Sequence, residues 1–122
     1  MPAQKLNVRG LASAITKNSV VLFQAPWCGY CKKFKPTFHD FADKVDQSKI
    51  TIAYIDADKH KAEMSEKEIG KNLYGGKISD QINGYPTVVM FKRIGDKHEA
   101  VIYDGPRELE ALQKATEEFF LP

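Results

Sequence analysis

The chain has 122 residues, 43% of them hydrophobic, so it is long enough to bury one core and short for two domains. Its 18 Lys and Arg against 16 Asp and Glu give a net charge of +2, with both signs scattered, which does not indicate a nucleic-acid or membrane-surface binder. No stretch approaches the roughly 20 apolar residues of a membrane helix. Residues 1–19 also lack the apolar region of a signal peptide. We therefore expect a cytoplasmic monomer without nucleic-acid or membrane partners, or an excised domain of a secretory-pathway protein.

The first half of the chain alternates strand and helix patterns. Residues 5–8 have the length of a short strand, residues 9–18 show weak helical spacing, and residues 19–25 form a continuous apolar run typical of a strand buried on both faces. The apolar residues that follow recur at helical spacing and predict one amphipathic helix: Phe34, Phe38, Phe41, Ala42 and Val45. Cys31 continues this stripe, and Cys28 falls at the helix entrance.

The next elements are a strand, a helix and a hairpin. Residues 50–56 predict another buried strand. Residues 86–94 and 98–105 flank the turn Gly95-Asp96-Lys97, which predicts an antiparallel hairpin. Between them lies an expected polar helix over residues 60–73, whose inward residues are Met64, Ile69 and Leu73.

A last helix is expected from Pro106, which suits a first helical position, to the end of the chain. Its inward face is expected to hold four residues: Leu109, Leu112, Thr116 and Phe119. Strands and helices thus alternate and end in a hairpin. This order predicts an α/β fold with a mixed central β-sheet flanked by helices on both faces.

The two cysteines form the motif Cys28-Gly-Tyr-Cys31. A crosslink between them closes a very short loop and stabilises a fold little. At a helix N-terminus, however, free backbone N–H groups and the helix dipole stabilise a thiolate, so Cys28 is expected to be a nucleophile. Cys31 lies one turn further on, where it can attack a mixed disulfide at Cys28 and release the substrate. The motif therefore predicts a redox-active dithiol.

The segment APWCGYCKKFKP, residues 25–36, resembles the active-site segment of the thioredoxin and protein disulfide isomerase family. The resemblance covers nearly the whole chain and implies one thioredoxin-fold domain over residues 1–122. It is weakest at about residues 58–83, a segment that is long for this family and precedes the expected cis-proline loop. That segment is either a tolerated surface insertion or a substrate-selecting loop.

Further residues match the family one by one. Pro36 corresponds to the proline that kinks the active-site helix. In GYPTVVMF, Pro86 corresponds to the cis-proline, and the backbone of Tyr85 is implied to pair with a substrate strand. In YDGPRELEAL, Arg107 corresponds to the arginine that approaches the site and tunes the resolving cysteine, with an ordinary surface charge as the alternative.

The chain also departs from the family pattern. Leu22 stands where a buried acid usually assists proton transfer, and the lysine that pairs with that acid would fall near Ile52. Between the cysteines, Gly29 and Tyr30 replace the Gly-Pro of thioredoxins and the Gly-His of isomerases, which suggests an intermediate reduction potential. Trp27 is expected to pack beside the pair and to shape the docking surface, or else to be ordinary core.

The resemblance implies thiol-disulfide exchange on protein substrates, with electrons entering and leaving through the cysteines. No cofactor is expected. An upstream reductase or oxidase is expected as a partner, and the direction of electron flow stays open. Two alternatives remain: a binding or chaperone module without turnover, and an iron-sulfur-bridging protein of the glutaredoxin kind. A structural metal site is not expected, because His39, His60 and His98 form no second half-site with the cysteines.

Overall fold

The computed structural model describes residues 1–71 and 76–121. In this part of the chain, no helix combines the length and the apolar character that crossing a membrane requires. The elements, in chain order, are β1 (Gln4–Leu6), α1 (Val8–Ala14), β2 (Ser19–Gln24), α2 (Gly29–Lys44), β3 (Thr51–Asp56), α3 (Ala57–Glu66), α5 (Ile78–Gln81), β4 (Thr87–Ile94), β5 (Lys97–Tyr103) and α6 (Leu109–Phe120).

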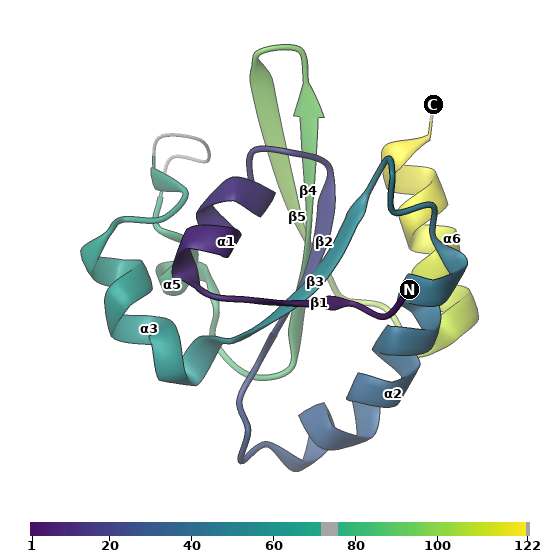
Figure 1. The fold of residues 1–122 in the computed structure, drawn as a ribbon, viewed down its shortest axis with the longest axis horizontal. Coiled ribbons are helices and arrows are strands. Elements are labelled where there is room, and N and C mark those ends of the chain that lie inside the picture. Colours follow the sequence, from purple (N-terminus) through teal and green to yellow (C-terminus); the bar gives the residue numbers. More distant parts are fainter. Residues whose placement is uncertain (72–75, 122) are drawn as a thin grey trace.

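The five strands form one mixed sheet in the order β1-β3-β2-β4-β5 (Figure 1). β3 runs parallel to both β1 and β2, while β4 runs antiparallel to β2 and β5. All six residues of β2 are buried, as its uninterrupted apolar run predicts. The expected mixed sheet is therefore confirmed, and its central strand leads directly into the cysteine motif.

Helices cover both faces of the sheet, as expected, with α2 and α6 on one side and α1, α3 and α5 on the other (Figure 1). Each side has its own hydrophobic core. Under α2 and α6 the largest fully buried side chains are Leu22, Phe38, Phe41, Ile52 and Leu112. Under α1, α3 and α5 they are Leu11, Phe23, Ile55, Met64, Ile78 and Phe91, together with Ile15.

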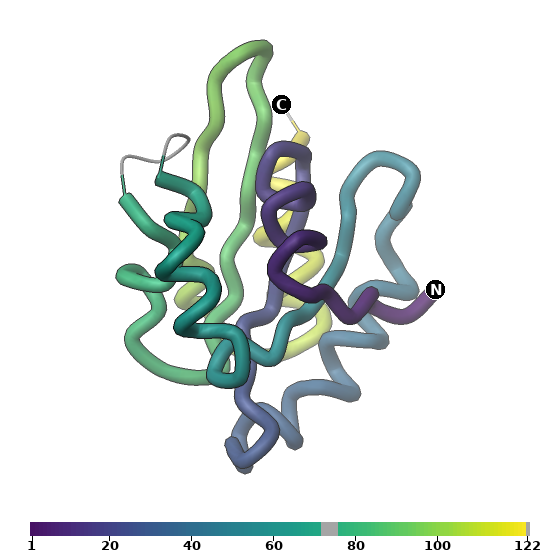
Figure 2. The backbone as a smooth tube through the Cα atoms, turned by 60° about the vertical axis from the view of Figure 1, so that its left-hand side comes forward, coloured from purple at the N-terminus to yellow at the C-terminus, as the bar shows by residue number. Residues whose placement is uncertain are grey.

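The amphipathic helix predicted after the cysteines is α2. Its buried residues are Cys31, Phe34, Phe38, Phe41 and Ala42, which confirms the predicted stripe, and Val45 caps the helix. Neighbouring rings along the stripe lie 5.8 Å apart between centroids, so they interlock against the sheet. Pro36 lies inside the helix, and Cys28 is the residue that caps its N-terminus. Figure 2 follows this stretch of backbone from β2 into α2.

The helix expected over residues 60–73 corresponds to α3, which is shorter and lies earlier in the chain. It begins at Ala57 and ends at Glu66. Left-handed backbone at Glu68 (φ 50°) and Gly70 (φ 84°) interrupts helical geometry there. Met64 and Ile69 are buried as expected, and Leu73 lies outside the described residues. The prediction was therefore right about Met64 and Ile69 and wrong about the helix bounds.

A short helix, α5, lies within the long segment at about residues 58–83 that precedes the proline. Its first residue, Ile78, is 1% exposed and belongs to the core under α1 and α3. The backbone N–H of Ile78 also donates to the carbonyl of Ile69 at 2.9 Å. One buried side chain thus fixes this segment against the fold.

The ends of the first and last helices also differ from the expectation. α1 ends at Ala14, because Ile15 caps it and the chain then turns towards β2. α6 begins at Leu109 rather than Pro106, since the backbone of Glu108 is still extended and the Tyr103 hydroxyl donates to the Pro106 carbonyl. Leu112, Thr116 and Phe120 are its buried residues, so Phe120 takes the innermost place expected for Phe119, which is partly buried.

Candidate active site

Cys28 lies where β2 has ended and α2 begins. Its sulfur accepts a hydrogen bond from the backbone N–H of Cys31 at 3.2 Å, so the side chain serves as the N-cap of the helix. Both cysteines are free thiols and are almost fully buried, at 6% and 2% exposure. The structure therefore brings the two sulfurs together at the first turn of α2, as the motif predicts.

The surroundings of Cys28 favour its thiolate. Burial raises the pKa of this thiol, but hydrogen bonds from the Cys31 side chain and from the backbone of Cys31 and Tyr30 act in the opposite direction. The positive charge of Arg107 adds to them, and the net result is a pKa below the ordinary value of 9.0. Cys28 is thus the more nucleophilic sulfur at neutral pH.

Cys31 has the opposite tendency. Burial is the largest cause that raises its pKa, followed by the hydrogen bond it donates to Cys28 and by the charge on that neighbour. A backbone hydrogen bond from Ala25 and the charge of Arg107 work against these effects, and the pKa of Cys31 reaches about 11. At neutral pH this thiol keeps its proton.

The segment around Pro86 closes one side of the cysteine pair. The Tyr85-Pro86 peptide bond is cis, and the Tyr85 carbonyl accepts a hydrogen bond from the Cys28 thiol over 3.6 Å. The Tyr85 ring packs against the cluster of Ala25, Cys28 and Cys31. Residues 57 positions apart in the sequence therefore share one surface.

Trp27 lies beside this surface and is 67% exposed, so it is not ordinary core. Its indole N–H donates to the Asp58 carboxylate at 2.9 Å, and its ring meets the Tyr85 ring edge-on, with centroids 6.0 Å apart. Asp58 was missed by the sequence reasoning. Its position two residues after the end of a buried parallel strand, at the same sheet edge as Trp27, is the signal that could have indicated it.

On the other side of the pair, the Arg107 guanidinium lies over the ring of Tyr30, 6.0 Å from its centroid. Tyr30 is 68% exposed. The positive charge of Arg107 acts to lower the pKa of both Cys28 and Cys31. Gly29, in contrast, makes no tight packing contact, since an added Cβ there meets nothing within 4 Å.

Leu22, at the position of the usual buried acid, is fully buried in the core beneath α2. The strand register pairs it with Tyr54, whereas Ile52, near which the paired lysine was expected to fall, lies opposite Val20. The Lys35 ammonium lies 4.6 Å from the centre of the Tyr54 ring.

The three histidines do not join the cysteines. His39 accepts a hydrogen bond from the Ala3 backbone at 3.0 Å, and His60 lies 3.8 Å from Glu63. Within residues 1–71 and 76–121, no group of three or more His, Cys, Asp or Glu side chains is placed to hold a metal ion.

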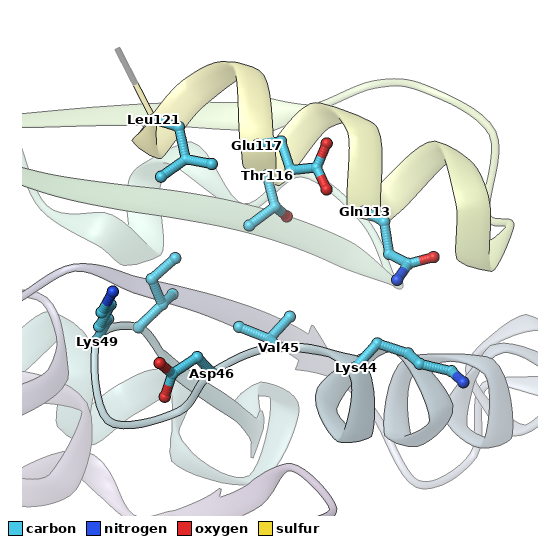
Figure 3. Close-up of a pocket in the computed structure, with 9 residues that line it drawn as sticks. Lys44, Val45, Asp46, Lys49, Gln113, Thr116, Glu117 and Leu121 are labelled. Carbon is cyan, nitrogen blue, oxygen red and sulfur yellow. The ribbon is translucent and has the colours of Figure 1, made fainter.

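A pocket of about 250 Å³ lies far along α2 from the cysteines, between the end of that helix and α6 (Figure 3). It is lined by Lys44, Asp46, Lys49 and Glu117 among others, and contains no cysteine. None of the predicted site residues lines it.

The five-stranded mixed sheet and the Cys-x-x-Cys pair at the first turn of α2 together define a thioredoxin fold. Comparison with solved structures agrees: the Trx4 domain of ERdj5 superposes with a TM-score of 0.73 over 98% of this chain and 96% of that domain. The two sequences are only 18% identical, so this likeness concerns the fold. A chain of human ERp44 gives a TM-score of 0.70 over 97% of this chain and 30% of its own length, at 19% identity.

Sequence comparison gives the family. Residues 4–72 match the thioredoxin family model, and the chain belongs to the thioredoxin family. It is 38% identical over 96 residues to a protein disulfide-isomerase of Saccharomyces cerevisiae, and 38% identical over 100 residues to protein disulfide isomerase-like 2-1 of Oryza sativa. These matches cover 79% and 81% of this chain but 16% and 23% of the two relatives, so the chain spans less than a quarter of their length.

Proposed function

We propose that this chain catalyses thiol-disulfide exchange on the cysteines of other proteins, as a protein disulfide isomerase-like member of its family. The observation that carries the proposal is the opposite shift of two thiols one helical turn apart. The pKa of Cys28 is lowered, while that of Cys31 is raised to about 11. Cys28 is thus the thiol that attacks first, and Cys31 stays protonated until the second step.

The reaction begins at Cys28. Its thiolate attacks one sulfur of a substrate disulfide, forms a mixed disulfide and releases the other substrate sulfur as a thiolate. The backbone N–H of Cys31, 3.2 Å from the Cys28 sulfur, stabilises the attacking anion before the bond forms. The nucleophile is therefore prepared by the start of α2 itself.

Cys31 completes the exchange. After it loses its proton, its thiolate attacks the sulfur of Cys28, which forms the Cys28–Cys31 disulfide and releases the second substrate thiolate. Two electrons have then passed from the pair to the substrate. In the reverse direction the oxidised pair accepts two electrons and leaves a disulfide in the substrate.

The surface around Cys28 suits an extended protein segment. The Tyr85 carbonyl lies beside the reacting sulfur, so backbone next to Pro86 is placed to pair with substrate backbone as an added strand. The exposed rings of Trp27 and Tyr30 on either side offer apolar contact area. Protein substrates, rather than small disulfides alone, fit this arrangement.

Reduction of insulin by dithiothreitol tests the proposal. The wild-type chain is expected to accelerate insulin precipitation, and Cys28→Ser is expected to abolish the acceleration. Cys31→Ser is expected to accumulate a covalent mixed disulfide with a substrate protein, visible on a non-reducing gel, because the resolving step is lost. Equal rates for the wild-type chain and both variants would show instead a binding module without turnover.

We favour the isomerase branch and the secretory-pathway lumen, because the relatives are named protein disulfide isomerases and disulfides persist in oxidising compartments. On this view residues 1–122 form one domain, its partners are proteins with thiols or disulfides, and a separate reductase or oxidase resets the pair. The reduction potential of the pair measured against glutathione decides the branch. A value near about −180 mV supports isomerisation, and one near about −270 mV indicates a thioredoxin-like reductase.

A further inference from the structure

Cys31 must lose a proton before it can attack, and its surroundings make that loss difficult. The side chain is 2% exposed, and its pKa is about 11. Leu22, which stands at the position of the usual buried acid, has no group that accepts a proton. A proton that leaves Cys31 therefore needs another route.

A pocket of about 270 Å³ opens beside Cys31 and reaches from the start of α2 to the carboxyl end of β3. Its lining includes Cys31, the carboxylate residue Asp56, the amide residue Gln24 and the phenol residue Tyr54. A water molecule occupies about 30 Å³ of liquid, so a polar pocket of this size holds several. Water can thus connect the thiol with the other polar groups.

Asp56 is firmly held in this pocket. Gln24 Nε2 donates to Asp56 Oδ1 at 2.9 Å, and Lys5 Nζ lies 3.4 Å from Oδ2. The residue is 8% exposed, and its burial acts to raise the pKa of the carboxyl group. Gln24, Lys5 and the charge of Lys35 outweigh that effect and leave the pKa below its ordinary value, so the carboxylate is ionised at neutral pH.

We propose that Asp56 is the proton acceptor for Cys31, reached through water in this pocket. The inference rests on the exchange reaction proposed above and concerns its second step. The Cys31 proton passes through water to the Asp56 carboxylate, which becomes a carboxylic acid. The electron pair left on the Cys31 sulfur forms the bond to Cys28 and expels the substrate thiolate. Asp56 then gives its proton to that thiolate or to solvent.

The other titratable groups that face the pocket do not fit this role. Lys5 on β1 and Lys32 and Lys35 on α2 offer hydrogen-bond donors and no acceptor, and Tyr54 on β3 carries a phenol, which is a weaker base than a carboxylate. An ionised carboxylate, even one whose pKa is lowered, is a much stronger base than water. Asp56 is thus the acceptor that this pocket offers.

The mixed disulfide makes the transfer easier. Two of the causes that raise the pKa of Cys31 are its hydrogen bond to Cys28 and the charge on Cys28. Both disappear when the Cys28 sulfur is bonded to substrate, so the pKa of Cys31 falls at the stage where its proton must leave. Arg107 remains and favours the Cys31 thiolate throughout.

Reaction with 5,5′-dithiobis(2-nitrobenzoate) separates the two steps in a stopped-flow absorbance experiment. Attack by Cys28 releases one nitrothiobenzoate, and attack by Cys31 on the resulting mixed disulfide releases a second. In Asp56→Asn at pH 7, the first release is expected within twofold of wild type and the second about tenfold slower or more. Added formate, a small carboxylate base, is expected to speed the second release in the variant but not in wild type.

Asp40→Asn, an exposed residue of α2 that removes the same charge, is the matched control and is expected to leave both releases unchanged. A second release in Asp56→Asn within twofold of wild type would overturn the proposal.

If Asp56→Asn does not fold, the rate of the second release in Lys5→Met decides. It removes a cation that lowers the carboxyl pKa, so a faster second release supports the relay, and an unchanged or slower one rejects it. Failure of the first release in wild type would instead reject the exchange function itself.

Discussion

Arg107 and Tyr30 form a cation–π contact beside the cysteine pair, with the guanidinium 6.0 Å from the centroid of the tyrosine ring. The contact joins the segment before α6 to the residue between the two cysteines. Because Arg107 lowers the pKa of both Cys28 and Cys31, whatever holds this side chain also tunes the thiols.

Removal of the charge in Arg107→Met is expected to raise the pKa of both thiols. Fewer thiolates are then present at pH 7, and the rate at which iodoacetamide alkylates Cys28 should fall roughly two- to fivefold, since partly exposed charges are screened. Lys114→Met, which removes a charge further along α6, serves as the control. An unchanged alkylation rate in Arg107→Met would show that the guanidinium does not act on the pair in solution.

Tyr30 is expected to hold Arg107 in place through the face of its aromatic ring. Tyr30→Phe keeps the aromatic face and should leave the alkylation rate of Cys28 close to wild type, whereas Tyr30→Leu removes it and should shift the rate in the same direction as Arg107→Met, by a smaller factor. Exposed cation–π contacts are worth about 0.5–1 kcal/mol. Equal rates in the Phe and Leu variants would indicate that the ring does not position Arg107.

The two thiols should differ in the pH dependence of alkylation. A thiol reacts as its thiolate, so the rate rises with pH and levels off above the pKa. For Cys28 in Cys31→Ser, the serine hydroxyl can donate in place of the thiol, and the backbone donors and Arg107 remain, so the midpoint is expected below pH 9.0. For Cys31 in Cys28→Ser, burial remains while the thiolate neighbour is gone, so the midpoint should lie above 9.0 and below about 11.

The hydrogen bond from Trp27 to Asp58 should affect the docking of protein substrates rather than the reactivity of the sulfurs. In Asp58→Leu, the indole loses its acceptor at 2.9 Å, and the KM for insulin is expected to rise roughly two- to fivefold. Asp58 is not among the groups that set the pKa of Cys28, so the alkylation profile of that thiol should not move. Trp27→Phe is expected to raise KM similarly, and a change in kcat alone would contradict this role.

The core beneath α2 should dominate stability. Phe38 is fully buried between Phe34 and Phe41, and Phe38→Ala is expected to lower the free energy of unfolding by about 3–5 kcal/mol. Lys33→Ala, on the exposed side of the same helix, should change it by less than about 0.5 kcal/mol. Urea denaturation followed by circular dichroism measures both values, and a loss below about 1 kcal/mol in Phe38→Ala would contradict the packing described.

Local patterns were sufficient to predict the centre of this molecule. The apolar run of β2 and the 3.6-residue stripe of α2 predict a buried strand followed by a helix, and they place Cys28 at the helix N-terminus. Cys31 continues the stripe, so its burial also follows from the sequence. These features depend on residues close together in the chain, where periodicity is informative.

Contacts between distant residues were less predictable. The start of α6 was misplaced because the Tyr103 hydroxyl bonds the Pro106 carbonyl and holds that segment out of the helix. The strand register that sets Tyr54 beside Leu22 and the hydrogen bond from Trp27 to Asp58 both depend on how the strands align. Single-sequence patterns carry little information about such alignment.

The hydrogen bond between Cys28 and Tyr85 spans 57 residues, and it has a consequence for newly made chains. A ribosome adds residues from the N-terminus, so both thiols emerge well before Tyr85, and Arg107 follows later still. During that interval the pair lacks the neighbours that protect and tune it, and its sulfurs are open to any disulfide nearby. Rapid pairing of β4 with the sheet, which brings Tyr85 to Cys28, therefore shortens the time in which the nascent chain can form a wrong disulfide.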